Sequence, residues 1–169
     1  MGWIGKIGLL LLLCGGLFSC AGDPSGALSF QEEECCYTAE CQVKGDITEQ
    51  GGNYIVEILH RPDGSGEIVF LSPQTIAGCK YLRTPSGEYS FQAEELVFPV
   101  AKNPTVEAIF GLFSLTEDQL LSAKTDENSG ESINVLTFDG GILLYLDRRG
   151  KPLYYDHPRL TLTIHVSPE

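Results

Sequence analysis

Apolar and polar side chains alternate with a period of two along most of the chain beyond residue 35, which is typical of strands that bury one face. Gly, Pro, Ser and Asp residues separate the alternating runs and predict turns. The predicted strands cover residues 37–44, 54–59, 67–71, 79–83, 88–93, 96–100, 133–138, 142–147, 152–155 and 160–166. The pattern therefore predicts a sheet built mainly of antiparallel neighbours.

Between the sixth and seventh of these strands the period changes to that of a helix. Asn103 can cap a helix whose first residue is Pro104. One apolar stripe at helical spacing follows, formed by Val106, Ile109, Phe110 and Phe113. A capping box that begins at Thr116 predicts a second short helix, in which Leu120 and Leu121 face inward. The predicted fold class is α+β, mainly antiparallel β.

An apolar leader precedes the alternating runs. Residues 7–18 follow Lys6 as a run of about a dozen mostly apolar residues, whereas a membrane-spanning helix needs about 20. The run ends in Leu17-Phe18-Ser19-Cys20-Ala21, which resembles the lipobox of bacterial lipoproteins. The resemblance implies that residues 1–19 are a lipoprotein signal peptide and that Cys20 carries a diacylglycerol. Such an anchor would hold the protein on the extracytoplasmic face of the cell membrane. An ordinary secretory signal cleaved near Cys20 is the alternative.

Composition divides the remainder into a tether and a domain. Residues 20–34 are rich in Gly, Pro, Ser and Glu and predict an acidic, solvated tether before one domain at residues 35–169. The chain has 23 acidic and 11 basic residues, a net charge of −12, and loss of Lys6 with the leader leaves −13. This charge excludes nucleic acid as a partner, because nucleic-acid binding needs a basic surface. Repulsion by anionic lipid within about 10 Å predicts a domain that stands off the bilayer.

Three stretches and the Pro104 helix together resemble the lipoprotein-carrier fold of the LolA and LppX type, in particular small lipobox-bearing proteins of Gram-positive bacteria. The stretches are 36–45, a first strand; 70–78, FLSPQTIAG, similar to a strand-Pro-x-x-Leu-x-Gly passage; and 146–153, LDRRGKPL, similar to a strand-Asp-x-x-Gly-x-Pro-Leu hairpin. The resemblance implies a curled, unclosed half-barrel sheet. It also implies that a helical insertion at about 103–123 covers the concave face.

The resemblance implies that the protein binds an apolar or amphiphilic, lipid-like ligand or a lipoprotein, and is not an enzyme. Burial alone could hold an acyl chain, because each methylene contributes about 0.8 kcal/mol. The predicted lining residues are Val43, Val56, Ile58, Val69, Leu71, Phe91, Ile109, Phe110 and Phe113. The same residues could instead fill a solid core. The domain would then be an interaction module that docks another envelope protein through an exposed face or edge strand.

Catalytic and metal-binding patterns are weak in this sequence. The histidines His60, His157 and His165 are scattered, and no nucleophile elbow, phosphate loop or His-Glu-x-x-His motif occurs. The acidic runs lack the alternating oxygen ligands of a calcium loop. The sequence therefore predicts no cofactor, no metal site and no catalytic residue.

Four cysteines follow Cys20 in the predicted domain. Outside the cytoplasm they could form disulfides. The sequence predicts either free buried thiols or one disulfide between Cys79 and one of Cys35, Cys36 and Cys41. Zinc is less favoured, because adjacent residues of a strand point to opposite faces.

Overall fold

A computed structural model describes residues 24–44, 51–126 and 132–167, and all of its strands belong to one 11-stranded antiparallel sheet. The strands are β1 (Cys35–Val43), β2 (Gly52–His60), β3 (Gly66–Ser72), β4 (Lys80–Arg83), β5 (Tyr89–Ala93), β6 (Leu96–Val100), β7 (Leu120–Asp126), β8 (Ile133–Phe138), β9 (Ile142–Leu146), β10 (Pro152–His157) and β11 (Leu162–Ser167). The helices are α1 (Pro104–Gly111) and the short 3-10 turns η1 (Pro24–Gln31), η2 (Glu117–Gln119), η3 (Asp139–Gly141) and η4 (Pro158–Leu160).

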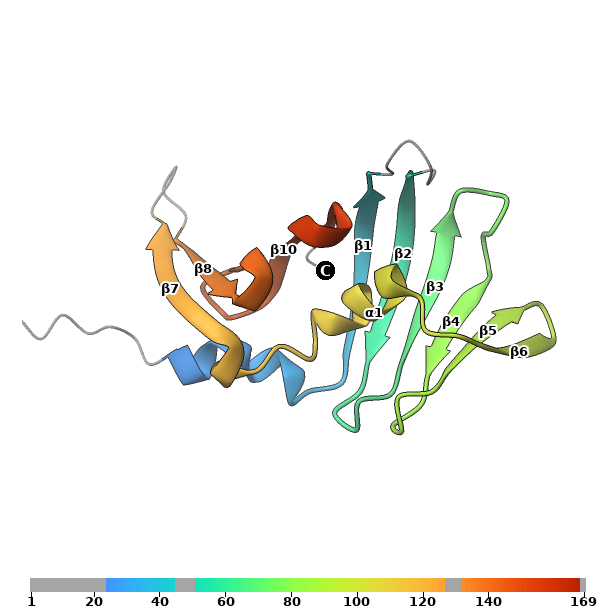
Figure 1. The fold of residues 1–169 in the computed structure, drawn as a ribbon, viewed down its shortest axis with the longest axis horizontal. Coiled ribbons are helices and arrows are strands. Elements are labelled where there is room, and N and C mark those ends of the chain that lie inside the picture. Colours follow the sequence, from blue (N-terminus) through green and yellow to red (C-terminus); the bar gives the residue numbers. More distant parts are fainter. Residues whose placement is uncertain (1–23, 45–50, 127–131, 168–169) are drawn as a thin grey trace, which may run out of the picture.

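The order of the strands explains why one helix crosses the sheet. The sheet runs β6-β5-β4-β3-β2-β1-β11-β10-β9-β8-β7, so β1 lies in the middle and the two edges are β6 and β7. These edge strands are consecutive in the chain, and the segment that joins them carries α1 across one face (Figure 1). The edges do not pair with each other, so the sheet is unclosed. The predicted fold class, mainly antiparallel β in an unclosed sheet with a short helix, is confirmed.

The alternation in β1 decides which face of the sheet is buried. Tyr37, Ala39 and Cys41 are buried, whereas Glu40 between them is exposed. Ala39 is paired with Val56 of β2 on one side, which places their side chains on the same face. On the other side Val166, Ile164 and Leu162 of β11 are the partners of β1 and are buried with it. The apolar face is therefore continuous across the centre of the sheet.

Helix α1 forms as its capping residues predict. The side chain of Asn103 accepts hydrogen bonds from the backbone N–H groups of Thr105, at 2.9 Å, and Val106, at 3.2 Å. Pro104 occupies the first turn, where no donor is needed. The helix buries Val106, Ala108, Ile109 and Phe110. It ends at Gly111, so the predicted helical insertion is shorter than the range 103–123.

The second predicted helix is wrong. The capping box does form, since Gln119 Oε1 accepts from the backbone N–H of Thr116 at 3.1 Å, but it begins only the three-residue turn η2. From Leu120 the chain continues as β7, which pairs with β8 along the sheet. Leu121, expected to face inward, has an exposed fraction of 64%. Hydrogen bonding to β8 therefore outweighs the local helix signal.

The segment expected to be a solvated tether instead packs onto the domain from η1 onward. Leu28 and Phe30 are buried in the main hydrophobic cluster. Gln31 Nε2 donates to the carbonyl oxygen of Leu115 at 2.7 Å, which ties η1 to the chain beyond α1. These two apolar residues are the reason that the prediction of solvation fails here. In the part of the chain that the structure describes, none of the helices has the length and apolar character needed to cross a bilayer.

Candidate functional site

A pocket of about 380 Å³ lies between α1 and the half of the sheet formed by β1 to β5. This volume falls within the range of about 300–1,000 Å³ that is usual for small-molecule sites. Its lining residues are Cys41, Val43, Tyr54, Val56, Phe70, Ile76, Tyr81, Phe91, Asn103, Thr105, Val106 and Ile109. The alternative of a solid core is therefore incorrect for this half of the concave face.

The helix leaves space here because its largest side chains point elsewhere. Phe110 packs against Tyr89, with ring centroids 5.9 Å apart, and under the guanidinium of Arg83. The side chains that α1 presents to the pocket are the smaller ones of Val106 and Ile109, together with Thr105 near its first turn. A short helix with medium-sized side chains cannot fill the concave face below it.

Aromatic side chains from successive strands line the pocket floor. The ring centroids of Tyr54 and Phe70 are 5.8 Å apart, those of Phe70 and Tyr81 are 6.1 Å apart, and those of Tyr81 and Phe91 are 5.1 Å apart. Each pair meets edge to face, at 62–73°. This geometry is favourable for aromatic pairs and holds the rings in place. We call these four residues the aromatic row.

The pocket carries no formal charge. No Asp, Glu, Lys, Arg or His is among the described residues that line it. Burial raises the pKa of the Cys41 thiol to about 12, so this group is neutral at physiological pH. The polar side chains of Asn103 and Thr105 stand together at the start of α1, and the oxygen of Asn103 is already used in capping. The arrangement suits an uncharged apolar group.

Four of the predicted lining residues lie around this pocket, namely Val43, Val56, Phe91 and Ile109. Three others, Ile58, Phe110 and Phe113, are packed in the core and have exposed fractions of 0%, 2% and 4%.

The remaining two predictions, Val69 and Leu71, are wrong because they lie on the opposite face of β3. Val69 is paired with Glu57 on one side and Lys80 on the other, both on the outer face of the sheet, and Leu71 has an exposed fraction of 47%. In their place Ile68 and Phe70 point inward, and Phe70 is part of the aromatic row. Because β3 has four successive apolar residues, its sequence does not indicate which of them point inward.

A second aromatic cluster closes the concave face beyond the end of α1. The ring of Phe113 is stacked on His60 at 4.7 Å and on Tyr37 at 6.0 Å, and Phe30 meets it edge-on at 6.0 Å. His60 Nε2 lies 3.2 Å from the carbonyl oxygen of Gln31. Burial lowers the pKa of the His60 imidazole and raises the pKa of the Tyr37 hydroxyl. These groups stabilise the packing of η1 and are not placed for catalysis.

The three histidines do not come together. His60 ends β2, His157 ends β10, and His165 lies exposed on β11 with its ring 4.6 Å from that of Tyr154. Over residues 24–44, 51–126 and 132–167, no three His, Cys, Asp or Glu side chains are grouped in a way that could hold a metal ion.

Cys79 is a free thiol in the structure, as are Cys35 and Cys41, so the predicted disulfide of Cys79 is absent. The order of the strands gives the reason. Cys79 immediately precedes β4, and β2 and β3 separate β4 from β1, which carries the other three cysteines. Three strand spacings amount to about 14 Å, well beyond the about 7 Å between Cα atoms that a disulfide can bridge.

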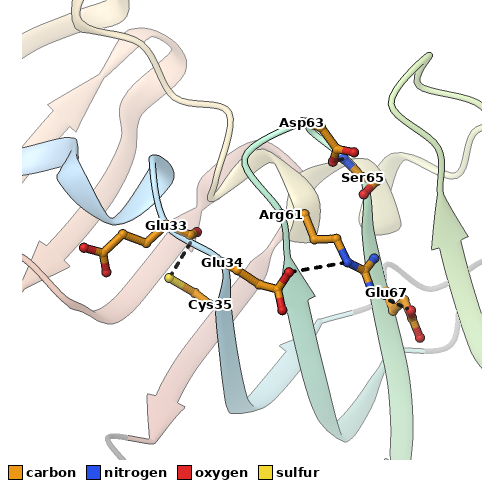
Figure 2. Close-up of polar contacts among 7 residues, drawn as sticks. All are labelled: Glu33, Glu34, Cys35, Arg61, Asp63, Ser65 and Glu67. Atoms are coloured by element: carbon orange, nitrogen blue, oxygen red, sulfur yellow. Dashed lines mark hydrogen bonds and ion pairs between the residues drawn. The ribbon is translucent and has the colours of Figure 1, made fainter.

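A polar network holds the start of β1 to the turn between β2 and β3 (Figure 2). Arg61 lies 3.1 Å from Glu67 and 3.8 Å from Glu34, and the carboxylate of Asp63 accepts from the backbone N–H of Ser65 at 2.9 Å. Hydrogen bonding from Ser65 lowers the pKa of the Asp63 carboxyl. Glu34 is exposed and Arg61 and Glu67 are half-buried, so the network positions the chain and adds modest stability.

No protein-family model matches the chain, and no curated protein matches it significantly in sequence. Solved structures with a similar fold include an outer membrane lipoprotein-sorting protein domain from Vibrio parahaemolyticus, with 10% identity, a TM-score of 0.46, and coverage of 85% of this chain and 88% of that one. A LolA superfamily protein from Nitrosomonas europaea has 11% identity and a TM-score of 0.41, and the match covers 82% of this chain and 71% of that one. LprF from Mycobacterium bovis has 12% identity and a TM-score of 0.43, and the match covers 85% of this chain and 89% of that one. These values describe a distant likeness.

Proposed function

We propose that this protein is a membrane-anchored extracytoplasmic lipoprotein that binds an apolar or amphiphilic, lipid-like ligand in the pocket under α1. The observation that carries this function is the pocket itself, whose volume is about 380 Å³ and whose lining is mainly apolar and carries no formal charge. A site of this kind binds through burial and needs no cofactor. The function is binding rather than catalysis.

The size of the pocket sets a scale for the affinity. A volume of 380 Å³ has room for about a dozen groups the size of a water molecule, and a methylene is of similar size. Burying a dozen methylenes contributes about 10 kcal/mol, from which association subtracts at least about 4 kcal/mol. The remainder, at best about 6 kcal/mol, corresponds to a Kd of tens of micromolar or weaker. The ligand is therefore expected to carry a chain or ring system that fills the whole pocket.

The proposed anchor is a diacylglycerol on Cys20, which lies outside the described residues. Pro24, the first described residue, follows Cys20 by four positions, so the connection from the anchor to η1 would span at most about 14 Å. The start of η1 would then remain close to the membrane surface. Labelling cells with radioactive palmitate tests the anchor, and incorporation that persists in Cys20→Ala would exclude this attachment.

Native mass spectrometry of the full chain, purified in mild detergent, tests the binding function. We expect bound lipid in the wild-type protein and in Leu71→Trp, in which the added ring lies on the outer face. Ile109→Trp places the same ring in the pocket and should abolish lipid binding. Lipid retained equally by both variants would show that the pocket is not the binding site.

A second candidate function is docking of another envelope protein along β7. This strand is a sheet edge without proline, and Leu121 is 64% exposed on it. An unpaired edge of this kind can accept a strand from a partner. The substitution Ala123→Pro would remove one backbone donor from β7 and should abolish a partner complex without affecting lipid binding.

A further inference from the structure

The apolar floor of the pocket does not end where the pocket ends. Phe91 lines the pocket and is paired with Phe98 of β6, and in the same register Ala93 is paired with Leu96. Paired residues point to the same face, so Phe98 and Leu96 continue the aromatic row on the concave side. Their exposed fractions are 48% and 63%, which are high for apolar residues next to a buried face.

The backbone of β6 makes this edge unsuitable for adding a strand. A two-residue turn at Glu94 and Glu95 joins β5 to β6, so Ala93 and Leu96 form the first hydrogen-bonded pair. Hydrogen-bonded and non-hydrogen-bonded pairs alternate from there, and Pro99 falls at a position whose backbone nitrogen faces the free edge. Proline has no N–H to donate, so a partner strand would lose a hydrogen bond in the middle of the ladder.

The charges near the aromatic row and the β5–β6 hairpin indicate which kind of ligand could bind there. Tyr81, Phe91 and Phe98 are aromatic residues without an acidic or basic side chain, whereas Glu94 and Glu95 stand at the tip of the hairpin beside Leu96. Two carboxylates at the tip oppose insertion of the hairpin into an anionic membrane surface. The exposed face therefore suits an uncharged apolar chain lying along the row.

We propose that the β5–β6 hairpin is a second subsite, on which Phe98 and Leu96 bind the distal part of the same apolar chain whose other end fills the pocket. This inference rests on the binding function proposed above and names its substrate class, which is ligands with one long unbranched chain. From Tyr54 on β2 to Phe98 on β6 there are four strand spacings, or about 19 Å. The chains of one membrane leaflet span about 15 Å, half of a hydrocarbon core of about 30 Å.

Chain-length dependence of binding separates the two subsites. The probes are monoacylglycerols with octanoyl, dodecanoyl and octadecanoyl chains, used below their aggregation concentrations, because their head group is uncharged. Titration calorimetry on the full chain should give an affinity that rises over the whole series for the wild-type protein. The double variant Leu96→Ser/Phe98→Ser should bind the octadecanoyl probe about tenfold more weakly and the octanoyl probe equally well.

The matched control is Val97→Ser on the same strand. Val97 is exposed to 55% but points to the outer face, so this variant should bind all three probes as the wild-type protein does. Equal binding of the octadecanoyl probe by the double variant and the wild-type protein would overturn the hairpin subsite. Failure of the wild-type protein to bind any probe would overturn the pocket function instead, so the two failures can be told apart. Circular dichroism checks that each variant is folded.

Discussion

The two halves of the sheet share one apolar face but treat it differently. In the half from β8 to β11, most inward side chains are tightly packed, and seven of them have exposed fractions of at most 1%: Leu136, Phe138, Leu144, Leu146, Tyr155, Leu162 and Ile164. In the half that borders the pocket, β1 to β5, the inward residues Phe70, Tyr81 and Phe91 are only partly buried.

The difference lies in what covers each half. The segments η1 and the chain beyond α1 add large buried side chains to the core, namely Leu28, Phe30, Leu112, Phe113 and Leu115, and none of these residues lines the pocket. The pocket half is covered by the first turns of α1, whose contacts with the floor are made by Val106 and Ile109. The packed half can stabilise the fold while the pocket half remains open to a ligand.

The largest expected effect comes from truncating one ring in each half. Phe138→Ala removes a fully buried ring and should lower the free energy of unfolding by about 3–5 kcal/mol. Phe91→Ala removes a ring that already borders open space, and we expect a loss of less than half that amount. Urea denaturation of the two variants measures both values. Equal losses would contradict the distinction between a packed and an open half.

Addition of ligand should stabilise only a protein with an open pocket. At a ligand concentration of about 100 times Kd, monododecanoylglycerol should raise the free energy of unfolding by about 2.7 kcal/mol, because it binds the folded state. Ile109→Trp, with its pocket filled, should gain nothing. Thermal denaturation with and without the ligand provides the measurement, and Leu71→Trp is the control that should still respond.

Acidic pH should weaken the packed region around Phe113. Burial lowers the pKa of His60 below the ordinary value of 6.5, so the unfolded chain binds the proton more readily than the folded protein does. The contribution of neutral His60 is therefore present above pH 6.5 and declines as the pH falls below it. His60→Phe should reduce this decline in urea denaturation at pH 7 and pH 5. His165→Gln, at an exposed position, should leave it unchanged.

The smallest effect is expected at the polar network of Arg61. Glu34→Gln removes an ion pair of 3.8 Å whose glutamate side chain is 66% exposed. Its loss should change the free energy of unfolding by less than about 1 kcal/mol. A loss of several kcal/mol in urea denaturation would mean that the start of β1 depends on this pair.

Patterns that repeat along the chain predicted the fold well. Apolar runs, most of them with period two, and the turns between them located ten of the strands, and Asn103 with Pro104 located the start of α1. The prediction failed at β7, because the signals at Thr116 are local whereas the pairing of Leu120 with Phe138 joins residues distant in sequence. The prediction also failed at η1. Leu28 and Phe30 are buried there by contacts with the rest of the domain, and the sequence of the segment alone does not indicate these contacts.

The candidate site was harder to predict than the fold. Alternation in β1 and β2 identified Val43 and Val56, but β3 has Ile68, Val69, Phe70 and Leu71 in succession and no visible parity. The pairing of Val56 with Phe70 and of Ile58 with Ile68 fixes that parity, and it is a property of the paired strands. The pocket exists because the side chains of α1 are too small to fill the space above the sheet. The periodicity of the sequence does not predict this difference in size.

Tryptophan fluorescence quenching tests ligand binding in the pocket most directly, because the chain has a single tryptophan that can be replaced. The only tryptophan of the chain is Trp3, in the predicted leader, so Phe91→Trp in a Trp3→Phe background places a single tryptophan in the pocket. Titration with a monoacylglycerol that carries bromine atoms in its chain should quench this fluorescence saturably, and should leave Leu71→Trp on the outer face unquenched. Absence of saturable quenching in Phe91→Trp, or equal quenching of both variants, would contradict the binding of an apolar chain under α1.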